Sequence, residues 1–148
     1  MSTKVAARAM HHFNASAERV YDAWLDPEKI RIWMKAALME MGLSGELGRI
    51  EVDARVGGRF FFSDMREIGE AKHWGTYLEL HRPHRIAFTW IVDASQENEP
   101  STVTITIEPD GEGCAATIVH EMSPEWASYV EKVEGGWSRM LRAIDRMV

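Results

Sequence analysis

Cysteine, basic residues and long apolar runs are all scarce in this sequence. Its only cysteine is Cys114, which excludes an intrachain disulfide and fits a reducing compartment. No run of about 18 apolar residues occurs, so no helix is expected to cross a membrane. No apolar segment of signal-peptide length follows the first residues, and we therefore expect a cytoplasmic protein.

The charge balance of the chain is acidic. Asp and Glu number 23 against 17 Lys and Arg, which gives a net charge of −6. No cluster of Lys and Arg could follow a phosphate backbone, so nucleic-acid binding is not expected. The excess of negative charge is primarily an indication of solubility and does not identify a function.

Motifs for metals, nucleotides and nucleophilic catalysis are also missing. His120-Glu121 is not followed by a histidine at helical spacing, and no cysteine or carboxylate cluster accompanies His81 and His84, so we expect no metal site. Gly57-Gly58 lacks the third glycine of a dinucleotide fingerprint, and we expect no cofactor. No serine stands in a G-x-S-x-G turn. These absences favour a binding protein over an enzyme.

Hydrophobic periodicity predicts one strand, two short helices, six further strands and a long final helix. Ser16 and Asp26 are suited to cap the two short helices, and Pro27 occupies the first position of the second one. The strands are predicted at residues 5–13, 50–54, 59–65, 74–80, 85–92, 102–108 and 114–122, and the long helix follows Ser123-Pro124.

Two segments allow more than one interpretation. Residues 35–49 mix apolar side chains with three glycines, which indicates a mobile loop, a broken helix that acts as a lid, or an ordinary packed loop. Gly135 and Gly136 lie within the last helix, where each costs about 1 kcal/mol relative to alanine. We expect either a close approach of this backbone to the sheet or a ligand, or a helix that begins near the glycines.

The predicted order of elements indicates a single α+β domain over residues 1–148. An antiparallel sheet needs a cover for its apolar face, and only the C-terminal helix is long enough to provide it. A curved antiparallel sheet around this helix, with two short helices after the first strand, is therefore the expected architecture.

Large aromatic side chains gather on strand and helix faces that are expected to point inward. Such rings form either a dry core or the walls of a pocket for a flat apolar ligand. Trp90 and Trp137 are the strongest wall candidates, because the sheet and the helix must meet there. The full set of predicted ligand-binding aromatic residues is Trp33, Phe60, Phe62, Trp74, Phe88, Trp90 and Trp137.

His120 is the polar residue best placed to act with these rings. It shares a strand face with Ile118, whereas Glu121 points to the opposite face, so the two residues do not form a dyad. In a cavity, the imidazole could bind a ligand hydroxyl or carboxylate, or act as an acid or base. The alternative is a structural histidine whose nitrogens are hydrogen-bonded within the protein.

Four segments of the chain resemble a known family in the same order. They are residues 13–28, residues 56–60, residues 83–90, and Gly136-Trp137 followed by Leu141 and Ile144. The family is named for the C-terminal domain of the activator of the heat-shock protein 90 ATPase and belongs to the START-like (SRPBCC) superfamily. The resemblance implies a helix-grip fold with a cavity between sheet and helix. Residues 34–38 lack the proline-containing stretch often found there, so the entrance loop is expected to differ.

Three functional hypotheses follow. The first is a protein that binds a small hydrophobic or aromatic molecule in a cavity larger than about 300 Å³, with His120 as polar anchor. The second, implied by the family, is an interaction with the heat-shock protein 90 chaperone. The third is a cyclase or dehydratase that uses His120 as its acid/base. An exposed edge strand, such as residues 5–13, would also allow a homodimer.

Overall fold

The structure is a computed structural model that describes residues 4–148. Its regular elements follow the predicted order, with two short 3-10 helices added. They are β1 (Val5–Phe13), α1 (Ala17–Leu25), α2 (Pro27–Glu40), β2 (Leu47–Val52), β3 (Arg59–Arg66), β4 (Gly69–His81), β5 (Arg85–Trp90), η1 (Ala94–Gln96), β6 (Ser101–Asp110), β7 (Gly113–Met122), η2 (Pro124–Tyr129) and α3 (Val130–Asp145).

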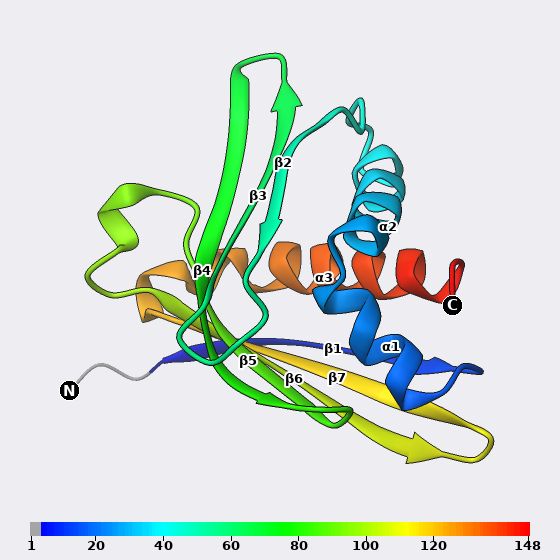
Figure 1. Cartoon of the computed structure of the whole chain (residues 1–148). Helices are drawn as coiled ribbons and strands as arrows, with labels where there is room; N and C mark the ends of the chain where they lie inside the picture. Colours follow the sequence, from blue (N-terminus) through cyan, green and yellow to red (C-terminus); the bar gives the residue numbers. More distant parts are fainter. Residues whose placement is uncertain (1–3) are drawn as a thin grey trace.

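The strands form one antiparallel sheet of seven strands in the order β1-β7-β6-β5-β4-β3-β2. Helix α3 runs across the sheet and packs against β1 and α2, while α1 and α2 lie together beside it (Figure 1). This arrangement confirms the predicted α+β helix-grip architecture. The first strand is one of the two edge strands, as the sequence predicted.

The sheet is bent within β4. The pairing of β4 with β5 shifts register between Tyr77 and Glu79, and the intervening Leu78 is 45% exposed. A bulge of this kind bends a strand and increases its twist. The arm formed by β2, β3 and the first half of β4 consequently rises away from the remaining strands, as Figure 1 shows.

Two segments differ from the sequence prediction. The interpretation of residues 35–49 as a loop or broken helix is wrong for its first part, because α2 continues to Glu40. Ala36, Ala37, Leu38 and Met39 favour a helix, and the chain leaves it at Gly42, whose φ of +85° suits glycine. The hairpin of β3 and β4 is also longer than expected and includes residues 69–73.

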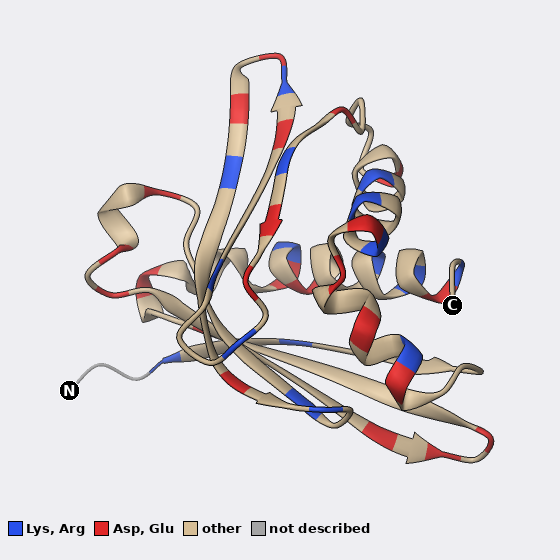
Figure 2. Cartoon of the chain, viewed as in Figure 1, with Lys and Arg blue, Asp and Glu red and all other residues tan. Residues whose placement is uncertain are grey.

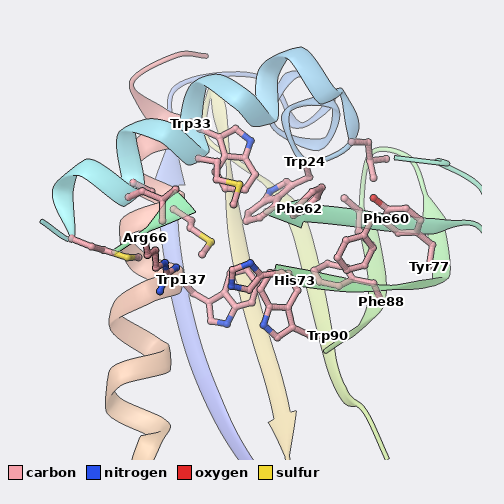
Figure 3. A pocket seen from close by; sticks show the side chains of 17 residues that line it. Trp24, Trp33, Phe60, Phe62, Arg66, His73, Tyr77, Phe88, Trp90 and Trp137 are labelled. Atoms are coloured by element: carbon pink, nitrogen blue, oxygen red, sulfur yellow. The ribbon is translucent and has the colours of Figure 1, made fainter. Parts of the chain in front are cut away.

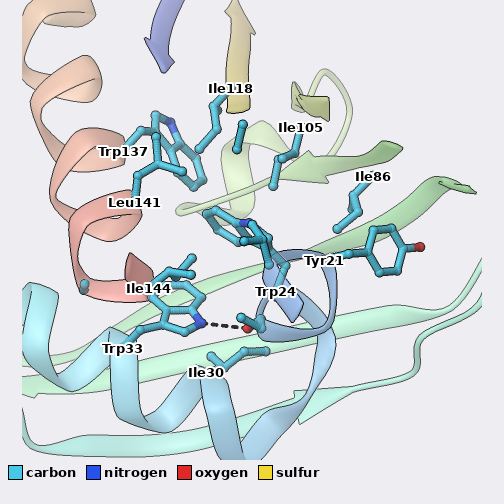
Figure 4. Close-up of a cluster of buried hydrophobic side chains, with 14 of the residues drawn as sticks. Tyr21, Trp24, Ile30, Trp33, Ile86, Ile105, Ile118, Trp137, Leu141 and Ile144 are labelled. Atoms are coloured by element: carbon cyan, nitrogen blue, oxygen red, sulfur yellow. Dashed lines mark hydrogen bonds between the residues drawn. The ribbon is translucent and has the colours of Figure 1, made fainter. Parts of the chain in front are cut away.

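The core lies between α3, the two preceding helices and the concave face of the sheet. Figure 4 shows Leu141 and Ile144 of α3 facing Ile118, Ile105 and Ile30. All five side chains have no exposed surface. Ser16 and Asp26 cap α1 and α2 by accepting hydrogen bonds from the backbone N–H groups of Arg19 and Glu28, as predicted.

Gly135 and Gly136 lie inside α3, so the helix does not begin at them. A Cβ atom on Gly135 would meet only the Arg139 Nη1 at 3.4 Å, and one on Gly136 only the Met41 Cε at 4.0 Å. The expected close approach of this backbone to the sheet is therefore absent. Neither glycine is required by packing.

Replacing Gly136 with alanine is expected to raise the free energy of unfolding by about 0.5–1 kcal/mol. The alanine fits the available space and reduces the conformational freedom of the unfolded chain. The matched control is Gly75→Ala, because a Cβ at Gly75 would lie 1.9 Å from the Thr89 carbonyl oxygen. Urea unfolding should show opposite signs for the two substitutions. A loss of stability in Gly136→Ala would contradict the prediction.

Charged side chains are distributed over all the elements. In Figure 2, Lys and Arg alternate with Asp and Glu rather than gather along one element. Arg142 of α3 and Arg146, which directly follows α3, pair with Glu40 at the end of α2, at 3.5 and 3.3 Å. Among residues 4–148, no helix combines the length and the apolar character needed to cross a membrane.

Candidate functional site

A cavity of about 170 Å³ lies between the bent sheet, α2 and α3. Figure 3 shows its lining side chains, which come from α1, α2, β3, β4, β5 and α3. They are Trp24, Leu25, Trp33, Met34, Ala37, Leu38, Met41, Phe60, Phe62, Arg66, His73, Tyr77, Ile86, Phe88, Trp90, Trp137 and Met140.

The prediction of a cavity larger than about 300 Å³ is wrong for this structure. About 170 Å³ lies below the lower end of the usual range for ligand pockets, about 300 Å³. An apolar cavity of about 150 Å³ is nevertheless known to hold benzene. The space therefore suits one aromatic ring with small substituents and is too small for a steroid or a long acyl chain.

Six of the seven predicted aromatic residues line this cavity: Trp33, Phe60, Phe62, Phe88, Trp90 and Trp137. Phe60, Phe62, Phe88, Trp90 and Trp137 form a connected set of ring contacts, and Trp33 joins it through Trp24. Phe60 and Phe88 have their centroids 5.4 Å apart, and Trp90 and Trp137 have theirs 5.3 Å apart. These separations are typical of stabilising aromatic pairs. Trp90 and Trp137 meet at the junction of sheet and helix, where the sequence analysis placed them.

Trp74 does not face the cavity, and its predicted inward orientation is wrong. Residues on β4 alternate between faces, and Trp74 pairs with Phe61 whereas His73 pairs with Phe62. Trp74 and Phe61 therefore share the outer face of the arm, where both line a surface groove with Lys72. Because the predicted strand begins at Trp74, the inward position of His73 was not predicted.

His120 forms a directional chain of hydrogen bonds. The Trp137 Nε1–H can only donate, and it donates to His120 Nδ1 at 3.1 Å. His120 Nε2 therefore carries the proton of the neutral ring and donates to Ser101 Oγ at 2.8 Å. Ser101 Oγ in turn donates to the Trp90 carbonyl oxygen at 2.8 Å. This chain joins α3, β7, β6 and β5 and fixes the two tryptophans that form the cavity wall.

His120 is not among the residues that line the cavity. It is 4% exposed and borders a separate groove of about 400 Å³ near η1 and η2, which it shares with Trp90 and Trp126. Burial lowers the pKa of His120 to about 4, so the ring stays neutral near pH 7. Both nitrogens are occupied by protein partners, which matches the structural alternative described for this residue.

Two polar residues of the cavity, Arg66 and His73, were missed by the sequence analysis. Arg66 donates from Nε to Asp64 Oδ2 at 2.8 Å and from Nη2 to Asp64 Oδ1 at 3.3 Å, and Asp64 is 1% exposed. His73 stacks on Trp90 with the ring centroids 5.2 Å apart. Burial lowers the pKa of His73, with a further lowering by Arg66 and an opposing effect of Asp64. The polar part of the cavity therefore carries a neutralised ion pair and a neutral imidazole.

The single cysteine, Cys114, is not activated as a nucleophile. Cys114 is buried on β7, and this burial raises the pKa of its thiol above the usual value. Within the described part of the chain, residues 4–148, no three His, Cys, Asp or Glu side chains are grouped so that they could hold a metal ion.

Comparison with known proteins gives one consistent result. The model of the family described as activator of Hsp90 ATPase homolog 1-like protein matches residues 14–148. The crystal structure of protein CV1439 from Chromobacterium violaceum is 29% identical, covers 97% of both chains and has a TM-score of 0.77. An AHSA1-like protein from Aeromonas hydrophila is 21% identical over 96% of this chain and 90% of its own, with a TM-score of 0.73. CalU16 from Micromonospora echinospora is 18% identical over 97% of this chain and 83% of its own, with a TM-score of 0.65. No curated protein gives a significant match.

Proposed function

We propose that this chain, which belongs to the family of activator of Hsp90 ATPase homolog 1-like proteins, binds a small aromatic or apolar molecule in the cavity between the sheet and α3. The observation that carries the proposal is a cavity of about 170 Å³ whose walls are almost entirely aromatic and aliphatic. A cytoplasmic location remains part of this proposal.

The composition of the cavity walls supports an apolar occupant. Apolar cavities of this size tend to exclude water and accept small aromatic molecules instead. The one charged lining residue, Arg66, is already paired with Asp64. Stacking against Trp90, Trp137 and Phe88 would provide most of the binding energy, because flat rings bury large areas of apolar surface.

Toluene is expected to cause a saturable change in tryptophan fluorescence, because tryptophans form much of the wall. Ala37 lines the cavity and is 1% exposed, so Ala37→Leu should fill the space and weaken toluene binding at least about tenfold. Ala127→Leu makes the same chemical change at an exposed position on η2 and should leave binding unchanged. Equal affinity in all three proteins, or no response to toluene, would refute binding in this cavity.

An interaction with the heat-shock protein 90 chaperone is a second candidate, and the family match is the observation that favours it. A pull-down with purified chaperone at physiological salt tests it directly. Retention of the chaperone would support this candidate, and no retention would remove it.

An enzymatic role for His120 has less support than binding. Its nitrogens are engaged by Trp137 and Ser101, and it does not line the cavity that would hold a substrate. A general acid or base must reach the reacting atom by hydrogen bond. His120 is better explained as the residue that holds Trp137 and Trp90 in place.

A further inference from the structure

Two buried side-chain polar atoms lack a hydrogen-bond partner within the described residues: Trp24 Nε1 and His73 Nδ1. Both residues line the cavity described above. We infer that the cavity binds an aromatic ring that carries an uncharged hydroxyl group, and that this hydroxyl is the missing partner of the Trp24 indole N–H. This inference rests on the proposed function and narrows the class of ligand.

The position of the two atoms is the first argument. Buried polar atoms in native proteins are almost always hydrogen-bonded, and each exception calls for an explanation. Trp33 provides the contrast within the same cavity, because its Nε1 donates to the Ala23 carbonyl oxygen at 2.7 Å (Figure 4). Trp24 is 6% exposed and its ring lies 5.1 Å from that of Trp33, yet its Nε1 has no acceptor in residues 4–148. Neither unpartnered atom has exposed surface in the cavity, so the oxygen of an occupant would reach the Trp24 Nε1 after a small rotation of the indole and would then supply the acceptor that the protein does not.

The chemistry of the two atoms selects the polar group. An indole N–H only donates, so its partner must carry an acceptor such as oxygen. A neutral imidazole nitrogen either donates or accepts, according to the tautomer. A hydroxyl group both donates and accepts, so it is the smallest group that can serve an indole N–H and an imidazole nitrogen in either tautomer.

The charge of the cavity argues against a carboxylate on the ligand. Arg66 and Asp64 already form an ion pair, and Figure 3 shows Arg66 at one side of the cavity and His73 nearer its middle, next to Trp90. An additional buried carboxylate would have no free counter-charge, and burying an uncompensated charge is strongly unfavourable. An uncharged hydroxyl avoids this penalty while still accepting a hydrogen bond.

The test compares three probes that differ in a single group: toluene, p-cresol and p-toluate. They are titrated at neutral pH into the full-length ¹⁵N-labelled protein, and the indole N–H signal of Trp24 is assigned with the Trp24→Phe variant. We expect p-cresol to bind about tenfold more tightly than toluene and to shift the Trp24 indole signal downfield. We expect p-toluate to bind most weakly.

Two variants decide whether Trp24 is responsible. Trp24→Phe removes the unpartnered N–H and should bring the affinities for p-cresol and toluene to within about twofold of each other. Trp33→Phe makes the same change in the same cavity but removes an N–H that is already used, so the preference for p-cresol should persist. Binding of toluene without any preference for p-cresol, or a preference that survives Trp24→Phe, would overturn the inference and leave the proposed function intact. No binding of either probe would overturn both.

Discussion

Truncating Leu141 to alanine is expected to lower the free energy of unfolding by about 3–4 kcal/mol. Leu141 has no exposed surface and lies on the face of α3 that meets the sheet, next to Trp137 and Ile118 (Figure 4). The substitution removes the transfer energy of the side chain and leaves a cavity that rigid neighbours can fill only in part. Urea-induced unfolding followed by circular dichroism measures the effect.

Leu78 provides the matched control for this prediction. It carries the same side chain in the bulge of β4 but is 45% exposed. Leu78→Ala should lower the free energy of unfolding by less than about 1 kcal/mol, because little apolar surface is lost from the interior. Similar losses in the two variants would show that α3 contributes less to the core than its burial indicates.

Acidification from pH 7 to pH 4 is expected to remove about 3 kcal/mol of stability through His120 alone. The folded state lowers the pKa of this residue from 6.5 to about 4. Between these values the unfolded chain binds a proton that the folded protein does not, so stability falls as the pH falls and levels off for this group below pH 4. His73, whose pKa is also lowered by burial, adds an effect of the same sign.

The contribution of His120 can be isolated with His120→Gln, which cannot titrate in this range. The free energy of unfolding is measured in urea at a series of pH values between 7 and 4 for both proteins. We expect a steeper loss of stability in the natural sequence, and the difference between the two curves should grow steadily below pH 6.5. Parallel curves would contradict the buried neutral state of His120.

Most of the fold could be predicted because the alternation of residue types is regular in the central strands. In β6, Val103, Ile105 and Ile107 alternate with Thr102, Thr104 and Thr106, and the three apolar side chains are fully buried. The start of β4 was missed because Gly69, Glu70 and Lys72 are exposed or charged and show no apolar alternation. Its strand structure depends on pairing with β3, which is a tertiary contact and not a local preference.

The candidate site was predicted less completely than the fold. The aromatic walls followed from strand and helix faces, but a start of β4 set at Trp74 concealed the inward face of Ala71, His73 and Gly75. Arg66 looks like an ordinary charged residue near a turn, and only the structure shows its ion pair with the buried Asp64. His120 was identified as important, yet its partners Ser101 and Trp137 are 19 and 17 residues away in sequence, so its tautomer could not be predicted.

The bulge at Leu78 makes the size of the cavity depend on the angle between the two parts of the sheet. Nine residues of β4 separate it from the turn that follows Arg66, a length of about 30 Å in an extended strand. A rotation of the arm by a few degrees at the bulge would move the far end of the arm by about 2 Å at this length. The arm carries Phe60, Phe62, Arg66 and His73, whereas Phe88, Trp90 and Trp137 remain on the other side of the bend. Relatives with identical lining residues could therefore have cavities of different size, through changes in a few residues at the bend that do not line the cavity.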